Sequence, residues 1–132
     1  MQLSRTTRYA VEALVHLARE GDGKLMPSHE VAQAEGIPER FLLKCLMPLV
    51  KARLLLSLRG PNGGYRLARP AGKVTLLEVV EATDGPILHR GDYREGKGGA
   101  GRLEESFEKA AAAARKELGK VTLADLAGKR GK

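Results

Sequence analysis

The segment Arg59–Leu67, with the sequence RGPNGGYRL, constrains the fold of this chain most strongly because it predicts a tight β-hairpin. Pro61 fixes φ at the first corner of a turn, and the segment Asn62–Gly64 accepts the positive φ values that reverse a strand. The tip is nearly bare backbone, with an arginine on each side. Two short helical segments precede this hairpin, in the order of a winged helix-turn-helix. The chain is therefore predicted to be mainly α-helical with a small β-hairpin wing, and to bind nucleic acid.

Positive charge gathers in the same region. The 132 residues carry 23 Lys and Arg against 16 Asp and Glu, and the net charge of +7 favours a polyanionic partner. Between Gly36 and Lys73 the only acid is Glu39. The bases there are Arg40, Lys44, Lys51, Arg53, Arg59, Arg66, Arg69 and Lys73. Charge alone leaves a second interpretation open, a solvated basic face without a partner.

Two helices are predicted at the N-terminal end. The first spans residues 4–20, where alanines and leucines recur at helical spacing, and it stops at Gly21. The second follows Pro27, with Ser28 as its N-cap, and ends at Gly36. Its inward-facing residues are predicted to be Val31, Ala32 and Ala34.

A third helix is predicted from Pro38, which suits a first helical turn. The short connection Gly36–Pro38 forces the sharp angle of a helix-turn-helix. The apolar face of this helix is Phe41, Leu42, Cys45, Leu46, Leu49 and Val50. Its opposite stripe is Arg40, Leu43, Lys44, Met47 and Lys51. Pro48 removes one helical hydrogen bond, which predicts a kink or an early end. The wing strands are predicted over residues 54–58 and 65–67.

The C-terminal third changes in composition. Thr75 and Glu78 form a capping box for a fourth helix that closes at Gly85. Glycine-rich residues follow, then a long alanine-rich helix, and Thr122–Ala127 adds a last turn. The chain is therefore predicted to consist of a winged helix-turn-helix domain over 1–85, a flexible loop over 86–102, and a dimerisation helix with a tail over 103–132.

The long helix carries a narrow apolar stripe that one exposed helix cannot bury alone. Only 4% of the residues are aromatic and none is Trp, so the core must be aliphatic, and dimerisation would complete its burial. The economical partner is the same helix in a second subunit, which predicts a two-fold homodimer. The predicted dimerisation residues are Leu103, Phe107, Ala111 or its neighbour Ala110, Ala114 and Leu118.

Several other classes of protein are not expected. No window of 18 uninterrupted apolar residues and no N-terminal signal core is present, so we expect a soluble, cytoplasmic protein without a membrane partner. One cysteine cannot form an internal disulfide, which fits a reducing compartment. No Ser-His-Asp set, P-loop or paired carboxylates stand out, so the chain is not expected to be an enzyme.

At this point three stretches resemble one family: Arg8–Ala10, the pair Ile37–Pro38 and, above all, Arg59–Leu67. They are similar to the Rrf-two family of winged helix-turn-helix bacterial transcription regulators, which includes the iron-sulfur-cluster regulator. The resemblance is strong from Met1 to about Pro86 and continues through the long helix to Thr122–Leu126. It implies a homodimer on a palindromic operator, with the third helix in the major groove and the wing arginine in the minor groove.

Carried over by position, the resemblance implies a set of DNA-binding residues. Those of the third helix are Pro38, Glu39, Arg40, Phe41, Leu43 and Lys44. Those of the wing are Arg59, Gly60, Asn62, Gly63, Gly64 and Tyr65. Phosphate anchoring is expected from Arg5, Thr7, Arg8, Ser28 and His29. Tyr65 as a packing residue of the hairpin and His29 as a plain surface residue remain the alternatives.

The chain departs from the family pattern at three places. Leu43 stands where a polar residue is frequent, and Arg53 stands where a glycine is usual between helix and wing. The loop lacks the three spaced cysteines that hold an iron-sulfur cluster in many members, and such clusters need thiolates. We therefore predict no cluster, no other cofactor and no metal site. Cys45 is expected to be a buried structural thiol rather than a redox sensor.

The leading hypothesis is a dimeric, sequence-specific transcription regulator, most simply a repressor, whose small-molecule or protein effector acts through the loop and the long helix. A second hypothesis keeps the winged fold but makes it an interaction module for a partner protein docked on residues 86–102. A third is a basic RNA-binding protein, although the few aromatic residues argue against a base-stacking surface.

Overall fold

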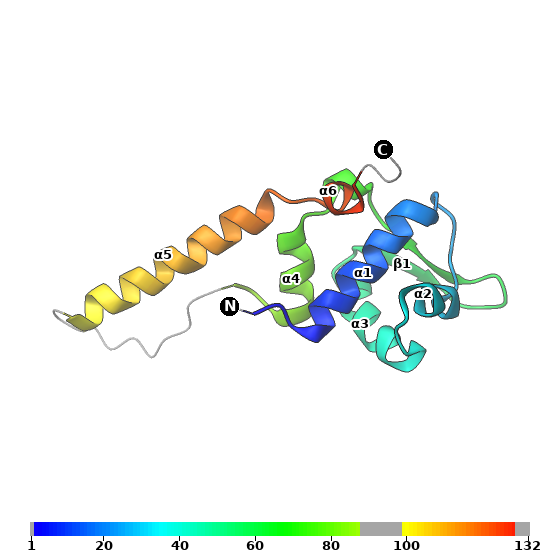
Figure 1. Ribbon diagram of the computed structural model, residues 1–132, viewed down its shortest axis with the longest axis horizontal. Coiled ribbons are helices and arrows are strands. Elements are labelled where there is room, and N and C mark those ends of the chain that lie inside the picture. The colour runs from blue at the N-terminus through cyan, green and yellow to red at the C-terminus, as the bar shows by residue number, and fades with distance from the viewer. Residues whose placement is uncertain (1, 88–98, 129–132) are drawn as a thin grey trace.

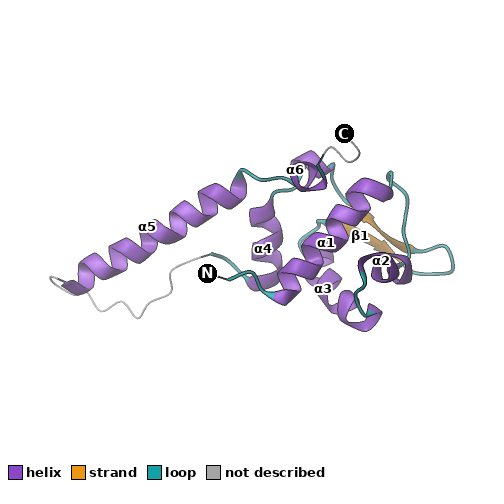
Figure 2. Ribbon diagram, viewed as in Figure 1, coloured by secondary structure: helices purple, strands orange, loops and turns teal. Residues whose placement is uncertain are grey.

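The computed structural model describes residues 2–87 and 99–128 (Figure 1). A group of helices packs together with a two-stranded hairpin at one side, and one long helix projects away from that group (Figure 2). In chain order the elements are α1 (Arg5–Glu20), α2 (Ser28–Glu35), α3 (Glu39–Lys51), β1 (Leu55–Leu58), β2 (Gly64–Leu67), the short 3-10 helix η1 (Ala71–Lys73), α4 (Leu76–Asp84), α5 (Gly99–Gly119) and α6 (Leu123–Ala127). This arrangement confirms the mainly helical fold with a hairpin wing.

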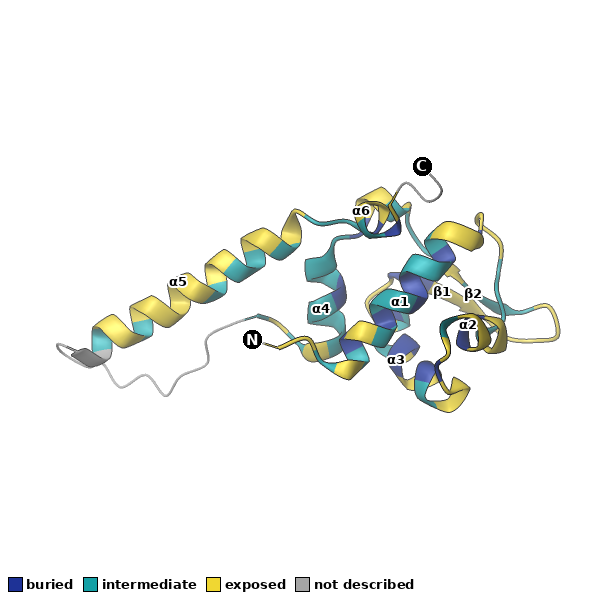
Figure 3. Cartoon of the chain, in the orientation of Figure 1, coloured by how far each residue is buried: buried dark blue, intermediate teal, exposed yellow. Residues whose placement is uncertain are grey.

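Helix α1 forms the centre of the packed part and contacts α2, α3, α4 and α6. Ser4 caps its start, because the Ser4 hydroxyl accepts the Thr7 N–H at 3.0 Å. Its buried face includes Ala10, Ala13 and Leu14, which recur at the predicted helical spacing (Figure 3). The small alanine side chains let neighbouring helices approach closely. Helix α1 therefore packs against α2, α3, α4 and α6 at once.

The connection between α2 and α3 has the predicted sharp turn. Gly36 adopts a left-handed conformation at φ 67°, and its N–H donates to the Ala32 carbonyl. Two predicted details of α2 are wrong. Its N-cap is Pro27, because the Ser28 hydroxyl donates instead to Glu39 at 2.7 Å. Ala34 is exposed, because the short helix has only a narrow buried side.

A kink or an early end was predicted at Pro48, and helix α3 continues through this proline to Lys51, so of these two only the early end is wrong. The helix ends at Lys51, one turn after the proline. Two hydrogen bonds cap this end: the Ala52 N–H donates to the Pro48 carbonyl, and the Leu54 N–H donates to the Leu49 carbonyl. The lost hydrogen bond of one proline is tolerated because the inner face of α3 is buried in the core. That inner face matches the predicted set, with Leu42, Cys45, Leu46 and Leu49 fully or almost fully buried.

Arg53, which follows α3, adopts a left-handed backbone at φ 63°. This conformation costs a residue with a Cβ about 1 to 2 kcal/mol, so we expect Arg53→Gly to raise the free energy of unfolding by about 1 kcal/mol. Ala52 is the control, because its φ of −81° needs no glycine and Ala52→Gly should lower stability. Urea denaturation at one protein concentration would measure the free energy of unfolding of both variants. If Arg53→Gly lowered stability as much as Ala52→Gly, the backbone of Arg53 would not be strained.

The hairpin pairs β1 with β2 in antiparallel register, with Leu55 opposite Leu67 and Leu58 opposite Gly64. Both strand positions match the prediction to within one residue. The turn is closed by the Gly63 N–H, which donates to the Gly60 carbonyl, and Pro61 occupies its first corner as predicted. The positive φ values lie at Gly60 and Gly64, so the prediction for Asn62 and Gly63 is wrong. Asn62 occupies the second corner of this turn and has no positive φ, as in a type I turn.

The C-terminal elements divide differently from the prediction. Helix α5 begins at Gly99, so the end of the predicted loop at residue 102 is wrong, and residues 88–98 of that loop lie outside the described part. Helix α6 is not a tail, because Leu123 is 0% exposed and α6 packs on α1 and η1. The Leu123 N–H donates to the Val74 carbonyl, which ties α6 to the segment before α4.

Candidate nucleic-acid interface

The outer face of α3 is the first part of the candidate surface. Helical spacing places Arg40, Leu43, Lys44 and Met47 on one side, opposite the buried residues, and Lys51 continues this side. All five side chains are exposed, as predicted. The buried inner face holds α3 firmly against the core, so the outer face is presented by a rigid element.

The cations of this face are available to a ligand. Within residues 2–87 and 99–128, no carboxylate forms an ion pair with Arg40, Lys44 or Lys51. The one acid at the start of the helix, Glu39, accepts the hydrogen bond from Ser28. The positive charge of the face is therefore not neutralised inside the described chain, which favours contact with a polyanion.

The wing is the second part of the surface. Arg59, Gly60 and Asn62 are exposed at its turn, whereas Gly63 and Gly64 are partly buried. Tyr65 fastens the wing to the loop before α2, since its backbone N–H donates to the Met26 carbonyl and its carbonyl accepts the Met26 N–H, both at 2.9 Å. The Tyr65 side chain packs against the core, so the packing interpretation of this residue is confirmed.

The first turn of α1 is the third part of the predicted surface, and Thr7 is a correction there. Thr7 is 1% exposed, and its hydroxyl donates to Asp84 at 2.9 Å, so a phosphate anchor at this side chain is wrong. The residue instead joins the start of α1 to the end of α4. Arg5 and Arg8, by contrast, are exposed.

The remaining predicted residues have mixed surroundings. Pro38 and His29 are exposed at the starts of α3 and α2. Phe41 is partly buried and packs edge-to-face on Tyr9, with ring centroids 5.2 Å apart. Its ring therefore orients the N-terminal end of α3 against α1 and has only part of its surface available for another contact.

Arg69, one of the bases counted in the sequence, is not free. Its guanidinium donates to Glu78 at 2.7 Å, which joins the end of the wing to α4. Partial burial would raise the pKa of Glu78, but hydrogen bonds from Thr75 and Arg69 and the charge of Arg69 together lower it. The carboxylate thus stays ionised at neutral pH and holds Arg69 away from any other anion.

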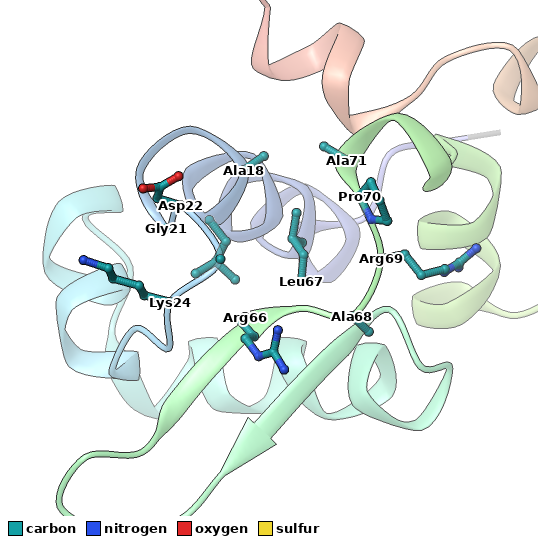
Figure 4. Close-up of a pocket in the computed structure, with 12 residues that line it drawn as sticks. Ala18, Gly21, Asp22, Lys24, Arg66, Leu67, Ala68, Arg69, Pro70 and Ala71 are labelled. Carbon is teal, nitrogen blue, oxygen red and sulfur yellow. The ribbon is translucent and has the colours of Figure 1, made fainter.

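A cleft of about 380 Å³ lies behind the wing, between the end of α1 and the segment that runs from β2 to η1 (Figure 4). Figure 4 shows Lys24 at one end of this cleft and Arg69, turned toward α4, at the other. Leu67 lines its apolar wall. Asp22 lies at its rim and opposes the positive charge there, so the cleft is less favourable to an anion than the outer face of α3.

Metal-binding groups do not gather in the part of the chain that the structure describes. Residues 2–87 and 99–128 hold no group of three or more His, Cys, Asp or Glu side chains placed to bind an ion. The Nδ1 atom of His16 lies 3.0 Å from a carboxylate oxygen of Glu35. Cys45 is buried as predicted, and burial raises the pKa of its thiol. In the same residues, no helix is both long enough and apolar enough to cross a bilayer.

Residues 3–129 match the Rrf2 family, which is described as iron-dependent transcriptional regulators. A protein of Mycobacterium tuberculosis strain H37Rv, provisionally named an HTH-type transcriptional regulator, is 36% identical over 132 residues, which cover 97% of this chain and 82% of that protein. Protein aau3 of Rhizobium meliloti is 46% identical over 84 residues, which cover 64% of this chain and 54% of that protein.

Solved structures agree with the sequence comparison. CymR, described as the global cysteine regulator of B. subtilis, superposes with a TM-score of 0.81 at 25% identity and covers 96% of both chains. IscR of T. potens superposes with a TM-score of 0.74 at 26% identity and covers 96% of this chain and 85% of its own. These likenesses confirm the winged-helix fold class predicted from the sequence.

The iron in the family's description does not fit the residues of this chain. Its single cysteine, Cys45, is fully buried in the core, and its raised pKa keeps the thiol protonated. Clusters and soft iron sites need several accessible thiolates.

Proposed function

The chain belongs to the Rrf2 family of transcriptional regulators, the family that its wing motif resembles, and on that premise we propose that it is a homodimeric repressor that binds a palindromic DNA operator. The observation that carries this proposal is the exposed cationic face of α3 beside the wing, which no carboxylate of the described residues neutralises. A polyanion with regular grooves is the partner that such a surface fits.

In this proposal α3 enters the major groove, where Arg40 and Lys44 donate to guanine edges or phosphates. These two side chains stand one helical turn apart on the same face. Arg59 enters the minor groove, where an A·T-rich sequence gives a narrow groove with strong negative potential. Arg5 and Arg8 contact phosphates and fix the register of the domain on the duplex.

The proposed dimer uses α5, which projects from the packed domain (Figure 1). Leu103 is 56% exposed and Phe107 is 53% exposed on this helix, and Ala111, Ala114 and Leu118 continue the stripe as half-buried residues. Removing such apolar area from water contributes about 25 cal/mol for each Å² buried. Packing α5 against its two-fold copy would bury the stripe and place two winged domains for two half-sites.

Arg59→Ala tests the wing in this proposal. We expect it to weaken binding to an A·T-rich duplex by about 1 to 3 kcal/mol at about 0.15 M salt, because the minor-groove charge is lost. Fluorescence anisotropy of a labelled duplex would measure the change. Arg102→Ala is the matched control, since it removes the same charge from an exposed position on α5. Equal losses in both variants would mean that Arg59 contributes only to the net charge.

A further inference from the structure

Two apolar side chains lie in the middle of the cationic face of α3. Leu43 is 39% exposed and Met47 is 61% exposed, and they are four residues apart on the same side of the helix. Arg40, Lys44 and Lys51 surround them. A single exposed leucine needs no explanation, but an adjacent apolar pair at the centre of a surface built for a polyanion does.

We propose that Leu43, with Met47 extending the same apolar strip, contacts the 5-methyl groups of thymines in the major groove, and so makes a T·A pair the preferred base pair beneath it. This inference rests on the proposed function and names the chemical group that the helix recognises. The strip's occupant is therefore DNA, and the surrounding cations are placed to hold the flanking phosphates.

The chemistry of the groove supports this assignment. Among the four bases, only thymine presents an apolar group, its C5-methyl, on the major-groove edge. Leucine offers no donor or acceptor, so over guanine or adenine it would remove water from polar edge atoms without replacing their hydrogen bonds. Over thymine the same side chain buries a methyl group. Discrimination then follows from both the gain at thymine and the loss at other bases.

The position of Leu43 on the helix fits this role. It lies in the N-terminal half of α3, the part of a recognition helix that contacts base edges. Its neighbours Leu42 and Leu46 are buried in the core, which fixes the direction in which Leu43 points. Met47 lies roughly 6 Å further along the axis, because each helical residue rises about 1.5 Å. Two thymines within about two base-pair steps are therefore expected in each half-site, at about 3.4 Å a step.

The experiment is a double-mutant cycle. One change removes the thymine methyl groups from the DNA, and the other removes the Leu43 side chain from the protein. The wild-type protein first enriches a randomised duplex library, and the enriched pool is copied once with thymine and once with uracil, which lacks only the methyl. Affinities for both copies are measured for the wild type, Leu43→Ser and Leu56→Ser. Leu56 is the matched control, a similarly exposed leucine of β1 that lies outside α3 and outside the wing turn at Arg59–Gly63.

The wild type should bind the uracil copy about fourfold more weakly for each contacted methyl, from about 0.8 kcal/mol for a buried methyl. Leu43→Ser should lose the part of this discrimination that comes from the methyl beneath Leu43 and keep only the part from the methyl beneath Met47, whereas Leu56→Ser should discriminate as the wild type does. Equal binding of the two copies by the wild type would overturn this inference and leave the proposed function standing. A Leu43→Ser variant that discriminates as strongly as the wild type would also overturn it.

Two further outcomes separate the inference from its premise. Failure of the library to enrich at all would remove the proposed function and the inference together. A change in sedimentation of Leu43→Ser, with no effect of uracil on the wild type, would identify the strip as an interface between copies of the chain and would overturn the inference.

Discussion

Replacing Gly64 by alanine is expected to lower the free energy of unfolding by about 2 to 5 kcal/mol, because the new Cβ has no room and the backbone there is strained for any other residue. Gly64 has φ 151°, and a Cβ on it would overlap the carbonyl group of Met26 and the nitrogen of Pro27. The adjacent Tyr65 makes both backbone hydrogen bonds to Met26. The substitution should therefore separate the wing from the loop before α2.

Chemical denaturation at one protein concentration would measure this loss. Gly72→Ala is the matched control, since its φ is not in the positive range and its Cβ would meet only the Ala124 side chain at 4.0 Å. That variant should change stability by no more than about 0.5 kcal/mol. If Gly64→Ala were as stable as Gly72→Ala, the wing would not approach the loop before α2 as closely as the structure shows.

Leu123→Ala is expected to lower the free energy of unfolding by about 2 to 5 kcal/mol, the range for truncating a buried leucine. Leu123 is 0% exposed, and its helix lies on α1 and η1. The residue therefore completes the core of the winged domain although it follows the long helix in sequence. The backbone contact of Leu123 with Val74 fixes it at this place.

The control for this prediction is Leu58→Ala, because Leu58 is 62% exposed on β1. It should cost about 0.5 kcal/mol or less. Both variants should be measured at the same protein concentration, because dimerisation would make stability depend on concentration. A loss at Leu123 no larger than that at Leu58 would show that α6 is a dispensable tail.

Local patterns predicted most of the fold. The spacing of Ala10, Ala13 and Leu14 gave the buried side of α1, and the capping box of Thr75 and Glu78 marked the start of α4. The turn after Arg59 and both wing strands were also found, because proline and glycine determine local backbone geometry directly. Helical spacing, capping boxes and turns depend only on residues that are close together in the sequence. For this reason they could be predicted correctly.

Long-range packing could not be predicted in the same way. Thr7 looked like a surface hydroxyl, but Asp84 and Thr83 from α4 enclose it. Leu123 sits in a segment too short to show a helical period, so no local pattern indicates that it joins the core of a domain predicted to end at residue 85. Helix α3 continued through Pro48 because burial of its inner face outweighs one lost hydrogen bond. The roles of Arg40, Lys44 and Arg59 in DNA binding stay predictions.

We propose that α3 and the wing of a dimer bind one palindromic DNA sequence. The most direct measurement is selection of genomic DNA fragments by the purified full chain at about 0.15 M salt, where specific and non-specific binding separate well. The expected result is recovery of one palindromic site, bound by two chains and lost in a variant combining Arg40→Ala, Lys44→Ala and Arg59→Ala. Fragments no more enriched with the wild type than with that triple variant would contradict the claim.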